Sequence, residues 1–361
     1  RVGEGFNYVP LLGDRKPPLD YRNESRRLGG SNLYLMALMQ KVIVLFSTLI
    51  AASLIGVGNA QTFYDGVIGP LSITKDGRAT LAVPVENREM SLRIVYPDQG
   101  GPYPIIVFSH GTFSSSDKYN LVVEFWAERG YVVILPNHLD ANYGIIPSKT
   151  EDMIRIIHTR ISDMSFILDN LDAIEGQNPG LKGKLNRNQI IAAGHSIGTQ
   201  VVLVNTGQRI RNPTNNYVTE SSEDRFMAAV MLSDPGKMSM MPDDTWKGGS
   251  APTFLSTGSE DYGLMGDGRR EAEYQNEILT LPDESTGDKY LLLIERGDHY
   301  FGGLIHRDVD KAPDYDGLAI FNAASLAFMD AHTRDAKSAW AFLKPNILSS
   351  ATDGRFVLTV E

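Results

Sequence analysis

The 361-residue sequence contains no cysteine. This absence excludes disulfide bonds, thiolate metal sites and a cysteine nucleophile. Basic residues are in the minority, with 34 lysines and arginines against 44 aspartates and glutamates and a formal net charge of −10. Because nucleic-acid-binding proteins usually carry a basic excess, we expect no nucleic-acid partner. Hydrophobic residues make up 42% of the chain, which is enough to build a large folded core.

A long membrane-spanning run is also missing near the N-terminus. The apolar stretch 42–57 has roughly 16 residues, fewer than the about 20 that cross a bilayer as a helix. It follows the basic Lys41 and ends in the small residues Gly58-Asn59-Ala60. A basic start, an apolar middle and a small-residue end are typical of a secretory signal peptide. We therefore expect residues 36–60 to direct export, which makes the protein secreted or periplasmic; the alternative is an apolar N-terminal segment that is buried or anchors the chain.

The chain divides into three parts on this reading. Residues 1–35 are polar and rich in Gly, Pro and Arg, and we expect an upstream extension whose origin the sequence leaves open. Residues 36–60 are the signal segment, and residues 61–361 are expected to form a single domain with no membrane span after processing. If the apolar segment is retained, it must be buried, for example against a second copy of the chain, so a homo-oligomer stays open.

Residues 61–361 alternate short apolar runs with longer amphipathic stretches. This alternation predicts an α/β fold with a mostly parallel central sheet and helices on both faces. The expected strands are 91–96, 105–108, 131–135, 189–193, 226–232, 253–257 and 290–294. The expected helices are 119–129, 150–171, 197–205 and 316–329.

The strongest motif is Gly194-His195-Ser196-Ile197-Gly198, which lies between an expected strand and an expected helix. This is the context of a nucleophile elbow, a tight turn that lifts the serine hydroxyl into the open. Flanking side chains would clash in such a turn, which explains the two glycines. The motif makes Ser196 the candidate nucleophile.

A second motif, Ser109-His110-Gly111-Thr112, follows the expected strand 105–108. The oxyanion that develops when a serine attacks a carbonyl group needs two preorganised N–H donors. We expect these donors to be the backbone N–H groups of Thr112 and of Ile197, the residue after the nucleophile. We expect His110 to hold this loop and not to act as the base.

A serine nucleophile needs a histidine base. The seven histidines are His110, His138, His158, His195, His299, His306 and His332. His299 follows the last expected strand, 290–294, which is where this chain order places a base, and His306 is the alternative. His195 lies inside the elbow, pointing away from the serine proton, and His138 could line the cleft.

The base needs a carboxylate that holds the imidazole tautomer. Asp261 and Asp234 both follow expected strands and both lie between Ser196 and His299 in the order Ser, acid, His. We predict Asp261 as the acid, with Asp234 as the first alternative and Glu260 as the second. The acid that is not used would cap a turn, as the Asp-Pro-Gly sequence at 234–236 suggests.

Four motifs together resemble the α/β-hydrolase superfamily: Phe108-Ser-His-Gly-Thr112, Gly130-Tyr-Val-Val-Ile-Leu-Pro136, the elbow, and Gly297-Asp-His299. Over residues 85–335 the chain is similar to dienelactone-hydrolase-like esterases, near platelet-activating-factor acetylhydrolases, chlorophyllases and bacterial cutinases. The resemblance implies the α/β-hydrolase fold and a serine esterase. It leaves the acid open, because cutinase-like members place it where Asp261 stands and acetylhydrolase-like members where Asp234 stands. Thr199 departs from the small glycine of many relatives.

The expected reaction is hydrolysis of small to medium acyl esters through an acyl-enzyme, with no cofactor and no metal. Phe113, His195 and Met238 are candidates for the substrate pocket. The alternatives on the same triad are a carbon–carbon bond hydrolase, a thioesterase and a peptidase. A non-catalytic binding protein of the same fold is a further alternative.

Overall fold

A computed structural model describes residues 63–207, 209–211, 218–219, 222–234, 251–262 and 288–361. The extension 1–35, the signal segment 36–60 and the pocket candidate Met238 lie outside the described residues. Within the described ranges, no helix is long and apolar enough to cross a membrane.

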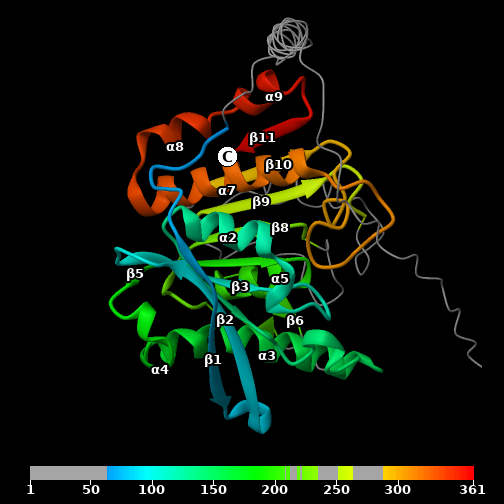
Figure 1. The fold of residues 1–361 in the computed structure, drawn as a ribbon. Helices are drawn as coiled ribbons and strands as arrows, with labels where there is room; N and C mark the ends of the chain where they lie inside the picture. Colours follow the sequence, from blue (N-terminus) through cyan, green and yellow to red (C-terminus); the bar gives the residue numbers. More distant parts are fainter. Residues whose placement is uncertain (1–62, 208, 212–217, 220–221, 235–250, 263–287) are drawn as a thin grey trace, which may run out of the picture. The chain divides into compact units, whose positions relative to one another are not determined.

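The framework is a nine-stranded sheet with the order β1-β2-β4-β3-β5-β8-β9-β10-β11 (Figure 1). Its strands are β1 (Ile73–Val83), β2 (Arg88–Pro97), β3 (Tyr103–Ser109), β4 (Val132–Pro136), β5 (Leu185–His195), β8 (Phe226–Leu232), β9 (Thr253–Gly258), β10 (Lys289–Ile294) and β11 (Phe356–Val360). The strands from β4 to β10 in this order run parallel. The outer strands β1, β2 and β11 pair antiparallel with their neighbours. The prediction of a mostly parallel central sheet is confirmed.

Helices cover both faces of the sheet (Figure 1). The helices are α2 (Asn120–Glu128), α3 (Thr150–Asp169), α4 (Leu171–Gln177), α5 (Ile197–Asn205), α7 (Tyr315–Arg334), α8 (Lys337–Phe342) and α9 (Ile347–Ala351). Short 3-10 turns are η1 (Val85–Asn87), η2 (Ser116–Lys118), η3 (Ala141–Tyr143) and η4 (Pro179–Leu181), and a small hairpin joins β6 (Ile210–Arg211) to β7 (Val218–Thr219). Helices α3, α4 and α5 pack on one face, and α2 and α7 pack on the other.

Strand β3 shows why a continuous apolar run forms a central strand. Ile105 and Val107 pack into the core beneath α3 and α5, while Ile106 and Phe108 pack into the core beneath α2 and α7. Successive side chains of a strand point to opposite faces, and a strand covered on both faces needs apolar residues at every position. All four side chains are at most 1% exposed.

Strands β1 and β11, the hairpin β6–β7 and helices α8 and α9 have no counterpart in the sequence expectation, and one helix boundary differs. β1 was not predicted, because Lys75, Asp76 and Arg78 interrupt its alternation where the register with β2 shifts. β11 was not predicted either; both are outermost strands of the sheet, where exposed positions dilute the apolar signal. The helix expected over 150–171 ends at Asp169, and α4 starts at Leu171.

Candidate active site

Ser196 lies in a strained turn between β5 and α5, with φ 56° and ψ −127°. The turn leaves no room for side chains: a Cβ at Gly194 would lie 2.5 Å from the Gly198 carbonyl oxygen, and one at Gly198 would lie 2.1 Å from the Ser109 carbonyl oxygen. Ser196 is partly exposed, whereas residues 190–195 and 197–205 on either side are buried. The backbone strain is thus associated with an accessible hydroxyl, as a nucleophile elbow requires.

The loop after β10 brings His299 onto Asp261, which follows β9. The His299 Nδ1 lies 2.8 Å from Asp261 Oδ1, and the Asp261 side chain is fully buried. A carboxylate only accepts, so His299 Nδ1 carries the proton and Nε2 is the ring nitrogen that can accept one. These are the two residues that the sequence analysis paired as base and acid.

The alternative acid Asp234 follows β8 and accepts hydrogen bonds from side chains of α5. Its Oδ2 lies 2.6 Å from the Thr199 hydroxyl and also accepts from the Gln200 amide. The Thr199 hydroxyl is in turn 2.7 Å from the Ser196 carbonyl oxygen. The departure at Thr199 therefore has a clear consequence, because its hydroxyl connects Asp234 to the backbone of the elbow.

His195 lies inside the elbow, and its ring packs against His299. Its ring centroid is 4.8 Å from that of His299, and its Nε2 is 2.9 Å from the His299 carbonyl oxygen. His195 is fully buried, so the expectation that it lines the substrate pocket is not met. The contact instead places the backbone of His299 beside the residue that precedes Ser196.

We name residues 110–113, which follow β3, the oxyanion loop after its predicted role. Among the described residues, the backbone N–H groups of Thr112 and Ile197 donate to no other backbone or side-chain group. Ile197 is the first residue of α5, where backbone N–H groups have no partner within the helix and favour a negative charge. Both groups are therefore available to an anion.

Arg160 of α3 is a fully buried residue that the sequence analysis missed. Its guanidinium donates to both carboxylate oxygens of Asp140, at 2.9 and 2.8 Å. It also donates to the carbonyl oxygens of His110 at 2.5 Å and Gly111 at 3.2 Å. The Gly111 carbonyl and the Thr112 N–H belong to one trans peptide unit and point in opposite directions. The Thr112 N–H therefore points away from the Arg160 guanidinium that binds the Gly111 carbonyl oxygen.

Burial and the ion pair between Arg160 and Asp140 together set the protonation states of the side chains around the oxyanion loop. Burial pushes the pKa of Asp140 upward, but the Arg160 charge and its hydrogen bonds outweigh burial and lower that pKa. Burial, with the Arg160 charge second, lowers the pKa of both His110 and His138. Asp140 is therefore ionised and the two histidines neutral near pH 7, so one buried cation faces one buried anion. The His110 ring contacts the loop itself, with Nδ1 2.7 Å from the Gly111 carbonyl oxygen, while its Nε2 accepts from the His138 backbone N–H at 3.2 Å.

A second Ser-His-Asp arrangement lies beneath the oxyanion loop. The Ser109 hydroxyl is 3.0 Å from His138 Nε2, and His138 Nδ1 is 2.8 Å from Asp163 Oδ2. Ser109 and Asp163 are fully buried and His138 is 3% exposed. His138 therefore does not line the cleft, and a substrate has no access to this serine.

We expect Arg160→Met to lower the free energy of unfolding by about 3–5 kcal/mol, because it removes the cation that faces the buried Asp140 carboxylate and leaves the Phe113 backbone N–H as its donor. Urea denaturation measures this change. The matched control is Arg155→Met on the same helix, which removes an exposed ion pair with Glu86 and should cost less than about 1 kcal/mol. Equal losses in the two variants would contradict the importance of the buried pair.

Two cavities flank the site. One, of about 400 Å³, is bordered by His299, Tyr262 and Tyr300. The other, of about 260 Å³, is bordered by Phe113 and Tyr143, whose rings stack at 5.2 Å. Phe113 borders this cavity, and its role in a substrate pocket stays a prediction. In the part of the chain that the structure describes, no three His, Asp or Glu side chains gather in a way that could hold a metal ion.

Comparison with known proteins matches residues 61–208 to the family model described as Chlorophyllase. The curated protein "Chlorophyllase type 0" of Chenopodium album is 29% identical over 107 residues. The chain has the α/β-hydrolase fold and resembles esterases of that fold. The resemblance predicted from the four motifs is confirmed at this level.

The two matches cover only part of the proteins compared. The 107 matched residues are 30% of this chain and 29% of the Chenopodium album protein. The family match spans the oxyanion loop and the elbow but stops before Asp261 and His299. The assignment of the acid and the base therefore depends on the geometry of this chain.

Proposed function

We propose that the protein is a serine carboxylic-ester hydrolase, with Ser196 as nucleophile, His299 as base and Asp261 as acid. The observation that carries the proposal is the 2.8 Å contact between His299 Nδ1 and Asp261 at the sheet edge where β5 presents the strained, partly exposed Ser196. Further support comes from the resemblance to chlorophyllases, which covers the elbow.

In the first half of the reaction, His299 Nε2 takes the proton of the Ser196 hydroxyl while Oγ bonds to the ester carbonyl carbon. The carbonyl electrons move to its oxygen, and the N–H groups of Thr112 and Ile197 stabilise the oxyanion by about 3–4 kcal/mol per donor. Collapse of this intermediate breaks the bond to the alcohol oxygen, which takes the proton from His299. The Asp261 carboxylate stabilises the imidazolium in between.

In the second half, a water molecule gives a proton to His299 Nε2 and its oxygen attacks the acyl carbon. The second oxyanion collapses, the bond to Ser196 Oγ breaks, and the serine recovers its proton from His299. The products are a carboxylic acid and an alcohol, and the enzyme returns to its starting state.

We propose small to medium acyl esters as the substrates; a cavity of about 400 Å³ borders His299 and one of about 260 Å³ borders Phe113 of the oxyanion loop. A series of p-nitrophenyl esters from acetate to palmitate tests the proposal. We expect the highest kcat/KM in the short and medium part of the series, together with stoichiometric labelling by a fluorophosphonate. Labelling without ester turnover would favour a carbon–carbon bond hydrolase, a thioesterase or a peptidase, and neither labelling nor turnover would favour a binding protein.

Export is part of the proposal and is supported by the sequence of residues 36–60, with its basic start, apolar middle and small-residue end. Cleavage after Ala60 would release a secreted or periplasmic enzyme that begins at Gln61. N-terminal sequencing of the protein recovered from the medium or periplasm tests this, and an N-terminus upstream of residue 36 would contradict it.

A further inference from the structure

The hydroxyl of Tyr119 lies at the centre of a buried group of side chains beside the oxyanion loop. It is 2.8 Å from the Gly111 backbone nitrogen, 3.1 Å from His195 Nδ1 and 3.3 Å from His306 Nδ1. We propose that Tyr119, His195 and His306 form a hydrogen-bond relay that fixes the oxyanion loop relative to the backbone of His299. These three are positioning residues, and the proposal rests on the proposed esterase function.

The inner end of the relay has a defined direction. The His299 carbonyl oxygen only accepts, so His195 Nε2 carries a proton and donates to it at 2.9 Å. A neutral imidazole has one N–H, which leaves His195 Nδ1 as an acceptor. The Tyr119 hydroxyl therefore donates its proton to His195 Nδ1.

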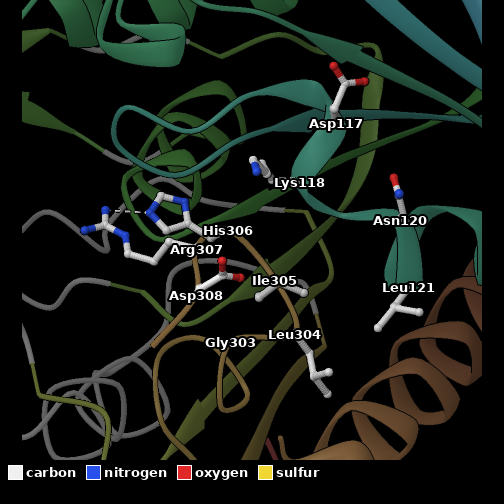
Figure 2. Close-up of a pocket in the computed structure, with 10 residues that line it drawn as sticks. All are labelled: Asp117, Lys118, Asn120, Leu121, Gly303, Leu304, Ile305, His306, Arg307 and Asp308. Atoms are coloured by element: carbon white, nitrogen blue, oxygen red, sulfur yellow. Dashed lines mark hydrogen bonds between the residues drawn. The ribbon is translucent and has the colours of Figure 1, made fainter. Parts of the chain in front are cut away.

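At the other end of the relay, from Arg307 to Tyr119, the protons are donated in the same direction, toward His299. The Arg307 guanidinium only donates, so His306 Nε2 accepts from it at 2.7 Å (Figure 2). His306 Nδ1 then carries the proton and points it at the Tyr119 oxygen. The donors are, in order, Arg307, His306, Tyr119 and His195, and the His299 carbonyl oxygen is the final acceptor; the Gly111 N–H also donates to the tyrosine oxygen. Each shared proton has one donor and one acceptor.

The relay stays uncharged across the working pH range of an esterase. Burial raises the pKa of Tyr119 to about 12. Burial, followed by the Arg307 charge, lowers the pKa of His306 to about 3. Burial, followed by the His299 charge, lowers the pKa of His195 well below its usual value. The two histidines therefore keep the single N–H that the direction of the relay requires.

Packing fits the same role. A Cβ at Gly111 would lie 2.9 Å from His195 Nδ1 and 3.0 Å from His306 Nδ1, so the loop backbone rests directly on both rings. The backbone N–H of His306 also donates to the backbone carbonyl oxygen of Lys118, the residue before Tyr119, at 3.0 Å. The oxyanion loop follows β3, and the loop that contains His299 follows β10. Strands β5, β8 and β9 lie between these two strands in the sheet. The relay connects these two loops across the elbow.

The test compares Tyr119→Phe with Tyr131→Phe in the full chain. Both tyrosines are fully buried, and the hydroxyl of Tyr131, the residue directly before β4, is 2.7 Å from Asp330 and 3.2 Å from Thr333, both on α7. We expect Tyr119→Phe to lower kcat about 10- to 100-fold with KM changed less than about threefold, since small misplacements of reacting groups have effects of this size. We expect Tyr131→Phe to lower stability but to keep the wild-type kcat.

A transition-state analogue separates positioning from general destabilisation. A trifluoromethyl ketone forms a tetrahedral adduct that needs the oxyanion donors, so its inhibition constant should rise in Tyr119→Phe by the factor by which kcat/KM falls. If Tyr119→Phe does not fold, His306→Asn and His306→Leu replace it. The asparagine keeps a donor near Nδ1 and should retain more kcat than the leucine.

The relay is refuted if Tyr119→Phe keeps kcat and ketone affinity within about twofold of wild type, or if His306→Asn is no better than His306→Leu. Failure of the proposed function looks different, because the wild-type chain then hydrolyses no ester. In that case hydrogen exchange of the Gly111 amide, followed by NMR, is the readout. Faster exchange in Tyr119→Phe supports the relay, and unchanged exchange overturns it.

Discussion

Ser196→Ala should lower kcat for p-nitrophenyl ester hydrolysis by about 10⁴- to 10⁶-fold, because it removes the atom that forms the acyl-enzyme. At φ 56° the backbone strain is the same for alanine as for serine, so the fold and its stability should change little. Steady-state kinetics gives the loss of kcat. Loss of fluorophosphonate labelling in the same variant shows that the probe reacts at this residue.

The control for Ser196 is Ser109→Ala, in the second Ser-His-Asp arrangement. Ser109 has a histidine and an aspartate at hydrogen-bond distance, yet it is fully buried and followed by the oxyanion loop. We expect a loss of kcat of less than about tenfold, caused by a small shift of the loop. Persistent labelling in Ser196→Ala that disappears in Ser109→Ala would mean that the nucleophile is Ser109.

Asp261→Asn should lower kcat by about 10⁴-fold with little change in KM. Asparagine keeps the size of the side chain but can present an N–H to His299 Nδ1, which favours the tautomer with its proton on Nε2. That tautomer cannot accept the Ser196 proton. The pH profile of kcat is a second measurement. Its shape should differ from that of the wild type, because the carboxylate that stabilises the protonated imidazole is gone.

Asp234→Asn is the matched control, because this carboxylate is equally buried and lies at the end of the neighbouring strand β8. Its contacts to Thr199 and Gln200 support the elbow, so we expect lower stability and a loss of kcat of about tenfold or less. Nearly full activity in Asp261→Asn with a loss of orders of magnitude in Asp234→Asn would reverse the assignment of the acid.

Much of the framework follows from local patterns in the sequence. The central strands can be predicted because strands buried on both faces need continuous apolar residues, as Ile105 to Phe108 show. The elbow can be predicted because the backbone of Ser196 tolerates only glycine at positions 194 and 198. The outer strands β1 and β11 could not be predicted, since half-exposed strands carry polar residues that look like loop.

Chain order alone limited the acid to a few carboxylates, since Asp234 and Asp261 both follow strands between the serine and the histidine. In the tertiary structure the loop after β10 folds back onto the end of β9 and brings His299 Nδ1 to 2.8 Å from Asp261, which supports the proposal of Asp261 as the acid. Which carboxylate a histidine meets depends on strand order in space, which local sequence does not contain.

The sequence by itself determined the fold class, the elbow serine and the loop that follows β3, because each has a short-range pattern with a steric cause. Only the tertiary structure revealed the roles of Arg160 and Tyr119, which a sequence reader assigns to ordinary helix positions. Arg160 comes from α3, and Tyr119 stands directly before α2. Each reaches the oxyanion loop across the fold, and a buried polar side chain reveals its role only through the partners that satisfy it.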